Sequence, residues 1–472
     1  MSRLELSPSH FRLLADRAVD LCAKLLESLD TLPAFPKTSA AETTAAFDTP
    51  LPEAGMGASA LDGLSDVVAL CRPPSPRFYG YVLGSGEPVA AVGDLVASIV
   101  NQNNTAWRSS PAGITIERTV VRWLAEAIGC AGFTGSLTGG GSSANLMALA
   151  MAREAKLPSN EAGVPPNGTI YASAEVHMSI GKAAALLGLG HKAVRLIPVD
   201  DRFRMIPSEL DRILAEDVRS GKRPVAVVAT AGTVNTGSID PLVEIGGIAR
   251  KHGAWFHVDG AYGALAAMAV PEKFVGLNLV DSLSLDPHKW LYQPVDCGCL
   301  LYRDPAAART AFSHSGDYTK TLSNDPIEGF AFFEESMELS RRFRALKLWL
   351  SLRYHGVEAF RNSIRGDLEL AQQLAHNISM QPALEVLAPV ELSAVCFRFT
   401  GGKNAAFTDA ELNAKNAAIL RKIIQRGNVY ISNATIRGLF ALRACIVNHR
   451  AKSDDMQLIV NETLAAAAEV VL

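Results

Sequence analysis

The sequence predicts an α/β protein with a mostly parallel sheet flanked by helices, an N-terminal helical arm and a small C-terminal α+β domain. From about residue 115 onward, helical periodicity alternates with short β-rich runs. These runs lie at 169–173, 192–199, 224–230, 254–259, 280–285 and 297–302. Such alternation is typical of parallel strands whose connecting helices cover both faces of one sheet. No period of 20–50 residues recurs along the chain, which excludes a repeat architecture.

The N-terminal segment is expected to form an amphipathic helix over residues 7–30. Apolar side chains recur there at helical spacing, at Phe11, Leu14, Ala18, Leu21 and Leu25. Residues 31–58 contain several prolines and are expected to form an extended linker. An arm of this kind needs a surface to pack on, which favours a dimer. We therefore divide the chain into an arm and linker (1–85), a large domain (86–345) and a small domain (346–472).

The remaining elements follow from local patterns. Residues 155–168 are rich in Pro and Gly and are expected to form a surface loop. Residues 339–355 predict an amphipathic helix, with strands near 394–400 and 439–447 behind it. This helix carries a cluster of arginines, and we expect a solvated or salt-bridged helix face rather than an anion site. The cluster consists of Arg341, Arg342 and Arg344.

The composition excludes several functional classes. Of the 472 residues, 48% are hydrophobic and 20% are charged, as in an ordinary globular protein. The net charge of −3 gives no field that would favour nucleic acid or an anionic membrane. Seven cysteines without a C-x-x-C pair indicate a reducing cytoplasm rather than a disulfide scaffold, and no metal site is expected. No signal peptide and no apolar stretch long enough to span a membrane is expected either.

Ligands of parallel sheets bind at the carboxyl ends of the strands, so the loops that leave the strands are the candidate sites. The first is the glycine-rich run TGGGSSAN, residues 138–145, which leads into a helix. Its glycines allow close backbone approach, and the amides of a helix N-terminus attract phosphate. It lacks the GK[ST] ending of a nucleotide P-loop. An ordinary helix cap, or a degenerate nucleophile elbow at Ser142, are the alternatives.

Two further loops carry weaker signals. His177 follows the strand at 169–173, where an imidazole could stack on a flat ring, move protons or simply be structural. Thr233 follows the β-branched run PVAVVAT and either offers a hydroxyl to a ligand or belongs to a turn.

The last two loops carry the strongest signals. Asp259 ends an apolar strand, and a buried acid needs a cationic or protonated partner such as a ligand nitrogen. A helix cap or a metal ligand is the alternative reading of this acid. Lys289 lies between His288 and Trp290, where poor solvation would lower the pKa of its amine and make it a nucleophile for carbonyls.

A phosphate cradle, a strand-end acid and a lysine 30 residues later match the parts of a pyridoxal phosphate site. The strings HVDGAYG and DPHKW resemble the group II pyridoxal-phosphate-dependent amino-acid decarboxylases, which include the aromatic L-amino-acid decarboxylases. The resemblance extends from FYGYV (78–82) through SSPAG (109–113) to LRACIVN (442–448). It implies the fold-type I fold and a homodimer with its sites near the subunit interface.

The resemblance also implies roles for individual residues. Lys289 would form an aldimine with pyridoxal phosphate, Asp259 would pair with the pyridine nitrogen, and His177 would stack on the ring. Tyr318, six residues after Phe312, would deliver a proton to the substrate. The other residues expected at the cofactor are Gly141, Ser142, Ser143, Thr233, Ala261 and His288. The expected reaction is decarboxylation of an L-amino acid, with aromatic substrates favoured, to an amine and carbon dioxide.

The expected substrate pocket departs from that of aromatic-specific relatives. Its residues are Tyr81, Val82, Asn103, Thr105 and Ser340. Asn and Thr at 103 and 105 make it more polar, and Ser340 should disfavour an indole relative to a phenol or imidazole. Asp286 stands where relatives often have Asn, and we expect it to cap the backbone, since it would repel a phosphate.

Several alternatives stay open. A decarboxylase of an acidic or other polar amino acid, an aldehyde synthase, an aminotransferase or a desulfurase would use the same cofactor. A serine hydrolase using Ser142, His177 and Asp259, or a binding protein without activity, are more remote.

Overall fold

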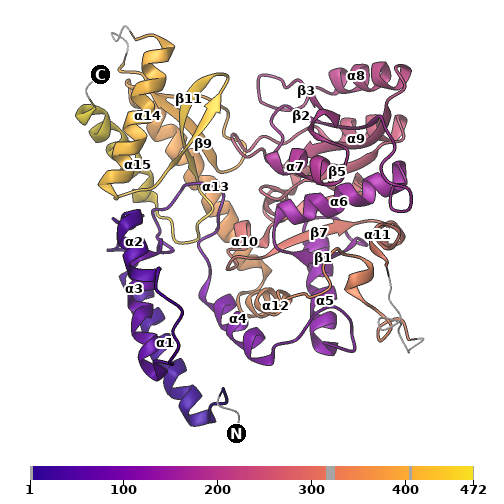
Figure 1. Cartoon of the computed structure of the whole chain (residues 1–472). Coiled ribbons are helices and arrows are strands. Elements are labelled where there is room, and N and C mark those ends of the chain that lie inside the picture. Colours follow the sequence, from indigo (N-terminus) through magenta and orange to yellow (C-terminus); the bar gives the residue numbers. More distant parts are fainter. Residues whose placement is uncertain (1–3, 315–324, 403–406, 471–472) are drawn as a thin grey trace.

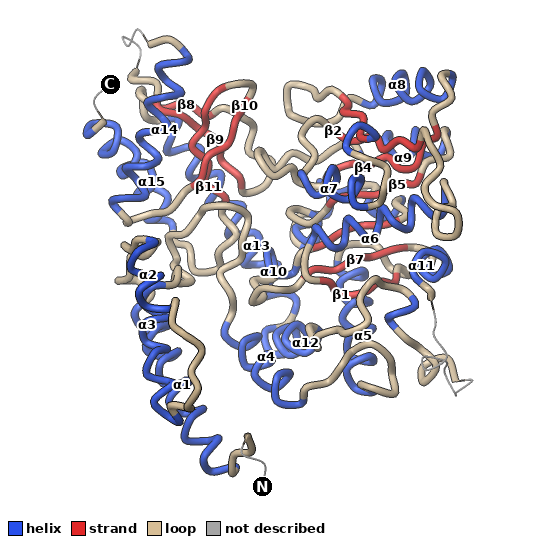
Figure 2. Tube along the Cα trace, in the orientation of Figure 1, coloured by secondary structure: helices blue, strands red, loops and turns tan. Residues whose placement is uncertain are grey.

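The structure is a computed structural model, and it describes residues 4–314, 325–402 and 407–470. The N-terminal helices form a column along one side of the molecule (Figure 1). A large sheet with its helices forms the body beside this column. A second, smaller sheet with its own helices lies above the column, at the end away from the N-terminus. The two sheets are separate, as the red strands of Figure 2 show.

The seven strands described in the large sheet have the order β1-β7-β6-β5-β4-β2-β3. Only β7 runs against its neighbours, β1 and β6, while the other pairs are parallel. This confirms the mostly parallel sheet predicted from the sequence. The bounds are β1 Thr134–Thr138, β2 Gly168–Ser173, β3 Val194–Ile197, β4 Arg223–Thr230, β5 Trp255–Asp259, β6 Ser282–Leu285 and β7 Gly298–Tyr302.

Both faces of this sheet are buried, because its strands are apolar on both sides. In β4, Val227 packs into one core cluster and Val228 into another. The first cluster includes side chains of α5 (Pro111–Ala127), α8 (Pro207–Arg219) and α9 (Leu242–Lys251). The second includes side chains of α6 (Gly141–Lys156), α7 (Met178–Leu186) and α11 (Pro305–Phe312). Helices therefore cover the two faces, as predicted.

The N-terminal arm confirms one prediction and corrects another. Helix α1 (Pro8–Ser28) lies where the periodicity predicted it. The expectation of an extended linker over 31–58 is wrong, because α2 (Ala40–Phe47) lies within it. A capping box between Ser39 and Glu42 begins this helix and was readable in the sequence. Next come α3 (Leu64–Leu70), which follows a 3₁₀ turn, and α4 (Pro88–Val100).

The predicted helix over 339–355 begins later, at Ala345, and is α12 (Ala345–His355). The arginine cluster therefore precedes this helix instead of forming its face, which corrects that part of the prediction. The salt bridge itself is present, because Arg341 Nη2 lies 2.5 Å from Glu117 Oε1, and both side chains are buried. Arg341 also donates to the carbonyl of Leu137 at 2.8 Å. One buried ion pair thus connects α5, β1 and the segment before α12.

The C-terminal part contains an antiparallel sheet whose described strands have the order β10-β11-β9-β8. Strands β9 and β11 confirm the two predicted strands. The bounds are β8 Leu384–Val386, β9 Ala394–Phe399, β10 Ser432–Ile436, β11 Leu439–Cys445, α13 Val357–Ser379, α14 Asp409–Arg426 and α15 Ser453–Glu469. The division of the chain after residues 85 and 345 stays a proposal. Within the described ranges, no helix combines the length and apolarity needed to cross a membrane.

A buried carboxyl group joins the C-terminal part to the large sheet. Asp367 of α13 accepts hydrogen bonds at Oδ2 from the Tyr292 hydroxyl (2.8 Å) and from the amide of Asn448 (3.0 Å). Burial raises the pKa of Asp367 to about 8, since these two donors only partly offset the loss of water. The folded protein therefore holds this carboxyl group protonated at neutral pH.

The stability of the protein should depend on pH through Asp367. The unfolded chain releases this proton above its ordinary pKa of 3.8, whereas the folded chain keeps it up to about pH 8. Between these values stability should fall as pH rises, by up to about 1.4 kcal/mol per pH unit. Asp367→Asn keeps the acceptor oxygen and cannot ionise, so it should lose this contribution. Urea unfolding at pH 5 and 7.5 measures the difference between the two proteins. The exposed substitution Asp201→Asn should keep the wild-type dependence, and an equal dependence in Asp367→Asn would contradict the assignment.

Candidate active site

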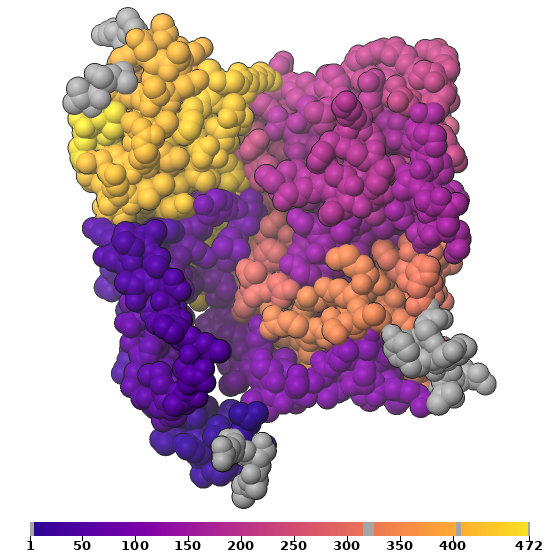
Figure 3. All heavy atoms as spheres, viewed as in Figure 1, coloured from indigo at the N-terminus to yellow at the C-terminus, as the bar shows by residue number. Residues whose placement is uncertain are grey.

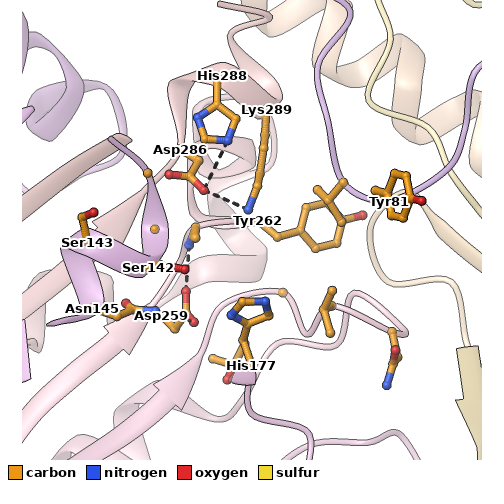
Figure 4. A pocket seen from close by; sticks show the side chains of 18 of the residues that line it. Tyr81, Ser142, Ser143, Asn145, His177, Asp259, Tyr262, Asp286, His288 and Lys289 are labelled. Carbon is orange, nitrogen blue, oxygen red and sulfur yellow. Dashed lines mark hydrogen bonds and ion pairs between the residues drawn. The ribbon is translucent and has the colours of Figure 1, made fainter. Parts of the chain in front are cut away.

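A cavity of about 520 Å³ lies at the carboxyl ends of the parallel strands. Lys289 and Asp259 both line it, so the two strongest candidates from the sequence share one site (Figure 4). Glycines from the run after β1 form one wall, and residues of the small sheet contribute to the opposite side. Other lining residues named below are Tyr81, Val82, Gly141, Ser142, Ser143, Asn145, His177, Asn235, Ala261, Asp286, His288, Ser432, Asn433 and Arg443.

Asp259 is the last residue of β5 and is only 5% exposed. Its Oδ2 accepts a hydrogen bond from Asn145 Nδ2 at 2.9 Å. Its Oδ1 accepts from the Ser284 hydroxyl at 3.1 Å and from the amide of Ala261 at 3.2 Å. Three donors from three elements thus stabilise the ionised form of this buried carboxyl group. The carboxylate can pair with a protonated ligand nitrogen.

A chain of buried side chains stands behind Asp259. Asn145 uses its amide nitrogen on Asp259, so its Oδ1 is free to accept from His257 Nε2 at 2.9 Å. The other ring nitrogen, Nδ1, lies 2.9 Å from the Ser282 hydroxyl and 3.1 Å from the Ser282 carbonyl. That hydroxyl accepts from Trp255 Nε1 at 2.8 Å. Burial lowers the pKa of His257 to about 4, so the ring is neutral at pH 7.

His177 is the N-cap residue of α7 and lines the cavity. The Ser179 amide donates to its Nδ1 at 3.2 Å, which makes this nitrogen an acceptor. The proton of the neutral ring is therefore on Nε2. Burial lowers the pKa of His177, although the charge of Asp259 opposes this shift. A neutral imidazole at this place can stack on a flat ring and donate from Nε2.

The glycine-rich run forms the turn between β1 and α6. Gly140 has φ +146°, a conformation that L side chains rarely adopt. A Cβ atom on Gly141 would lie 2.6 Å from the Cβ of Ala261, so the site requires glycine there. No side chain caps α6, and the first-turn amides of Gly141, Ser142 and Ser143 have no acceptor within the helix. This end of α6 is suited to bind an anion at the cavity wall.

Lys289 lies in the short helix α10 (Pro287–Trp290), directly after β6. Its Nζ lies 2.9 Å from Asp286 Oδ2. The prediction that Asp286 caps the backbone is wrong, because its side chain makes no cap hydrogen bond and pairs with the lysine instead. His288 donates from Nδ1 to the Cys297 carbonyl at 2.7 Å, and burial lowers the pKa of this histidine. Its Nε2 lies 3.6 Å from the same Asp286 oxygen.

Four residues predicted for the site are absent from the cavity lining. Thr233 is buried in a turn, where its hydroxyl contacts Thr236 at 2.8 Å. Asn103 accepts from the Arg341 amide at 2.9 Å. Thr105 and Ser340 also lie outside the lining, and Ser340 is exposed. Tyr318, the predicted proton donor, lies outside the described residues.

One side of the cavity is built from Tyr81, Val82 and the small sheet. Tyr81 has φ +61°, and its backbone carbonyl accepts from Arg443 of β11 at 3.1 Å. The same guanidinium group donates to the carbonyls of Val234 and Asn235. Arg443 therefore ties three segments of the cavity wall together through their main chains.

Sequence reasoning gave no role to Asn145, His257, Ser284 or Arg443. A usable signal existed for His257, because side chains two apart in a strand share a face and His257 precedes Asp259 by two residues. Asn145 was quoted as the end of the glycine-rich run, one turn into the helix. The partners of these residues come from distant segments, so only the structure identifies them.

The hydrolase alternative does not match this geometry. In a catalytic triad the histidine donates from one nitrogen to the acid. Here the Nδ1 of His177 is an acceptor for Ser179, and the oxygens of Asp259 are bound to other donors. Among the residues that the structure describes, no group of three or more His, Cys, Asp or Glu is arranged to hold a metal ion.

Comparisons with known proteins agree with this site. Residues 66–400 match the family described as "Pyridoxal-dependent decarboxylase conserved domain". An aromatic-L-amino-acid decarboxylase of Bacillus atrophaeus is 36% identical over 399 residues, which cover 84% of this chain and 82% of that protein. A phenylacetaldehyde synthase of Petunia hybrida is 31% identical over 388 residues, or 79% of this chain and 76% of that one. The crystal structure of Oryza sativa TDC with PLP and tryptamine has a TM-score of 0.92, 27% identity and 99% coverage of both chains. The chain belongs to the family of pyridoxal-phosphate-dependent amino-acid decarboxylases.

Proposed function

We propose that this pyridoxal-dependent decarboxylase acts on an aromatic L-amino acid and releases the corresponding amine and carbon dioxide. The observation that carries the proposal is one cavity in which Lys289, Asp259 and the N-terminus of α6 face a common space. The aromatic substrate is supported by the activity named for the Bacillus relative. Tyr81 adds an aromatic side chain to the lining of this cavity.

The lining residues fit pyridoxal phosphate. The first-turn amides of α6 offer donors for its phosphate, with Ser142 and Ser143 adding hydroxyl groups. The carboxylate of Asp259 suits the protonated ring nitrogen, and the amine of Lys289 suits the aldehyde. Gly141 lets the start of α6 pack directly against Ala261, because a Cβ atom there would lie 2.6 Å from the Ala261 Cβ. Ala261 and His288 complete the proposed cofactor contacts. Thr233 is not among the lining residues, so its proposed contact with the cofactor is indirect.

The cofactor, when bound, supplies an aldehyde that condenses with amines and a protonated ring that accepts electrons from the substrate's α-carbon. Asp259 would pair with the ring nitrogen and favour its protonated form, and three hydrogen-bond donors hold the carboxyl group in place. His177 would pack its neutral ring against the cofactor and offer its Nε2 proton to an oxygen of the substrate or cofactor.

We assign proton delivery to the α-carbon to Tyr318, on the basis of its position in the sequence. The phenylacetaldehyde synthase among the relatives makes an aldehyde product the alternative reaction on the same fold. Tyr at position 318 favours the amine, because prompt protonation of the α-carbon leaves no electron-rich carbon with which oxygen could react.

We also propose a homodimer in a reducing, cytoplasmic compartment. Helix α1 buries none of its residues within its own chain, although Phe11, Leu13 and Val19 are apolar. Figure 3 shows this arm standing beside the large body. Helix α4 likewise exposes a row of apolar side chains, namely Val92, Leu95, Val96, Ile99 and Val100. Large exposed apolar surfaces of this kind are typical of subunit interfaces.

The dimer accounts for the residues that are absent from the cavity. Asn103, Thr105 and Ser340 lie outside the lining of their own chain's cavity, and Asn103 lies three residues after the end of α4. We propose that they reach the substrate pocket of the second subunit. The reducing compartment is supported by the seven cysteines, all of which are free and two of which are exposed.

Replacing Lys289 should abolish covalent attachment of the cofactor. Wild type, treated with borohydride, should retain the cofactor as a stable adduct on the peptide that contains Lys289, detectable by mass spectrometry. Lys289→Ala should give no adduct and lose at least about 10³-fold in amine production, since no other lysine among the described residues lines the cavity. Lys273→Ala, on the surface, is the matched control and should behave as wild type. An adduct on a different lysine would refute the assignment.

Tyr318→Phe should separate decarboxylation from cofactor binding. The variant should bind the cofactor with wild-type absorbance and produce amine about 10²-fold more slowly or less, because the proton donor is missing. A panel of L-amino acids scored for carbon dioxide, amine and aldehyde gives both the substrate and the product ratio. Unchanged amine production by Tyr318→Phe would show that another group delivers the proton.

The exposed row on α4 should be buried in the dimer. The double substitution Val96→Glu and Ile99→Glu places charges in the proposed interface and should shift the protein to monomer in sedimentation experiments. Val218→Glu introduces one charge at a similarly exposed position on α8 and should leave the dimer intact. A wild-type protein that sediments as a monomer at micromolar concentration would rule out the proposal.

A further inference from the structure

Asp286 places a carboxyl group, whose charge would repel an anion, in the proposed phosphate site. Its side chain is 4% exposed and lies against the first turn of α6. A Cβ atom built on Gly141 would be 3.1 Å from Asp286 Oδ2, and one on Gly140 would be 4.0 Å from Oδ1. The carboxyl group therefore faces the glycines of the proposed anion site. Figure 4 shows Asp286 beside His288 and Lys289 at the cavity.

The two oxygens of this carboxyl group have different surroundings. Oδ2 is 2.9 Å from Lys289 Nζ and 3.6 Å from His288 Nε2. Oδ1 is buried and has no hydrogen-bond partner within the described protein. An unpaired buried oxygen is costly, and its position beside an anion-binding helix end indicates that a ligand supplies the partner.

A second carboxylate near the glycine-rich run has its negative charge balanced by arginines. Asp296 Oδ2 would be 3.3 Å from a Cβ atom on Gly139, so it lies as close to the glycines as Asp286 does. It is paired with Arg344 at 3.1 Å and with Arg342 at 3.2 Å, and these charges lower its pKa. Within the described residues Asp286 has no arginine partner, and its close cation is Lys289, which we assign to the cofactor's aldehyde.

We propose that Asp286 takes up one proton when the cofactor's phosphate binds, and that its carboxyl group then donates a hydrogen bond from Oδ1 to a phosphate oxygen. The proton comes from solvent, and no bond to carbon or phosphorus changes. Two acidic groups that share a buried site cannot both carry their full charge, so they hold a proton between them. This inference rests on the assignment of the α6 N-terminus as the phosphate site.

None of the other groups that face Asp286 is as well placed to take up this proton. They are Lys289, His288, His177, Asp259, Cys297 and Cys299. Burial lowers the pKa of both histidines and raises that of both thiols, so none of these four supplies a charge at neutral pH. Asp259 is already held by Asn145 and Ser284.

The test measures proton uptake with a ligand that cannot react with Lys289. Pyridoxine 5′-phosphate carries an alcohol in place of the aldehyde, and its phosphate is a dianion at pH 8 because its second pKa is about 6. It is titrated into the cofactor-free full-length protein at pH 8, in two buffers of different ionisation enthalpy. Calorimetry then gives the affinity and the number of protons taken up. Pyridoxine, without the phosphate, reports the protons that belong to the ring alone.

Wild type should take up about one proton more with pyridoxine 5′-phosphate than with pyridoxine. Because binding then requires a proton, the affinity for the phosphate ester should fall about tenfold per pH unit above neutrality. Asp286→Asn should lose this extra proton and bind the ester at least about tenfold more tightly than wild type at pH 8.5, with little difference at pH 6. Asp296→Asn, the matched control, should keep the wild-type proton count.

Two results would overturn the inference. Equal proton uptake by wild type for the two ligands would show, without any variant, that the phosphate brings no proton. Unchanged proton uptake in Asp286→Asn would show that a different group receives it. In both cases the ester still binds, so the cofactor site stands. Failure of every protein to bind the ester would instead refute the phosphate site itself, and the inference with it.

Discussion

The arrangement of the site depends on one buried carboxylate. Asp259 ends a strand in the middle of the sheet and is nearly sealed from water. An ionised acid is stable there only if donors replace its hydration, and these come from α6, the end of β6 and the turn after β5. The glycines begin the same helix α6, and Lys289 follows the same strand β6 in α10. The hydrogen bonds of Asp259 therefore also fix the proposed cofactor-binding groups relative to each other.

Much of this architecture could be predicted from the sequence, because most helices and strands have a characteristic residue pattern within their own segment. The run PVAVVAT is β-branched and apolar, and it forms a strand as predicted. β1 was missed, since TGSLT contains a single large apolar residue and gains its burial from β7 alongside it. α2 was missed because prolines on both sides outweighed a short capping box. The arginines before α12 continue its helical pattern in the sequence, but they lie outside the helix. They form ion pairs with Glu117 and Asp296, which are distant in the sequence.

The sequence predicted the residue types of the candidate site but not the hydrogen bonds and ion pairs between them. A strand-end acid, a lysine beside an aromatic ring and a glycine-rich helix start identify the cofactor, and the structure places them around one cavity. The support behind Asp259 involves Asn145, His257 and Ser282, whose contacts bridge more than 20 residues each. Asp286 was assigned to the backbone, because a sequence cannot show that a lysine three positions on turns back towards it. Charge balance within a cavity is a property of the folded chain.

Arg443 has a consequence for how such a pocket can change. Its guanidinium group grips main-chain carbonyls of Tyr81, Val234 and Asn235, so the outline of the recess is set by backbone rather than by the side chains around it. Val82 and Asn433 add side chains to the same lining, and Ser432 Oγ also accepts from Arg443 at 3.5 Å. Substitution of Val82 or Asn433 is therefore expected to change the shape of the recess while the main-chain contacts of Arg443 stay in place.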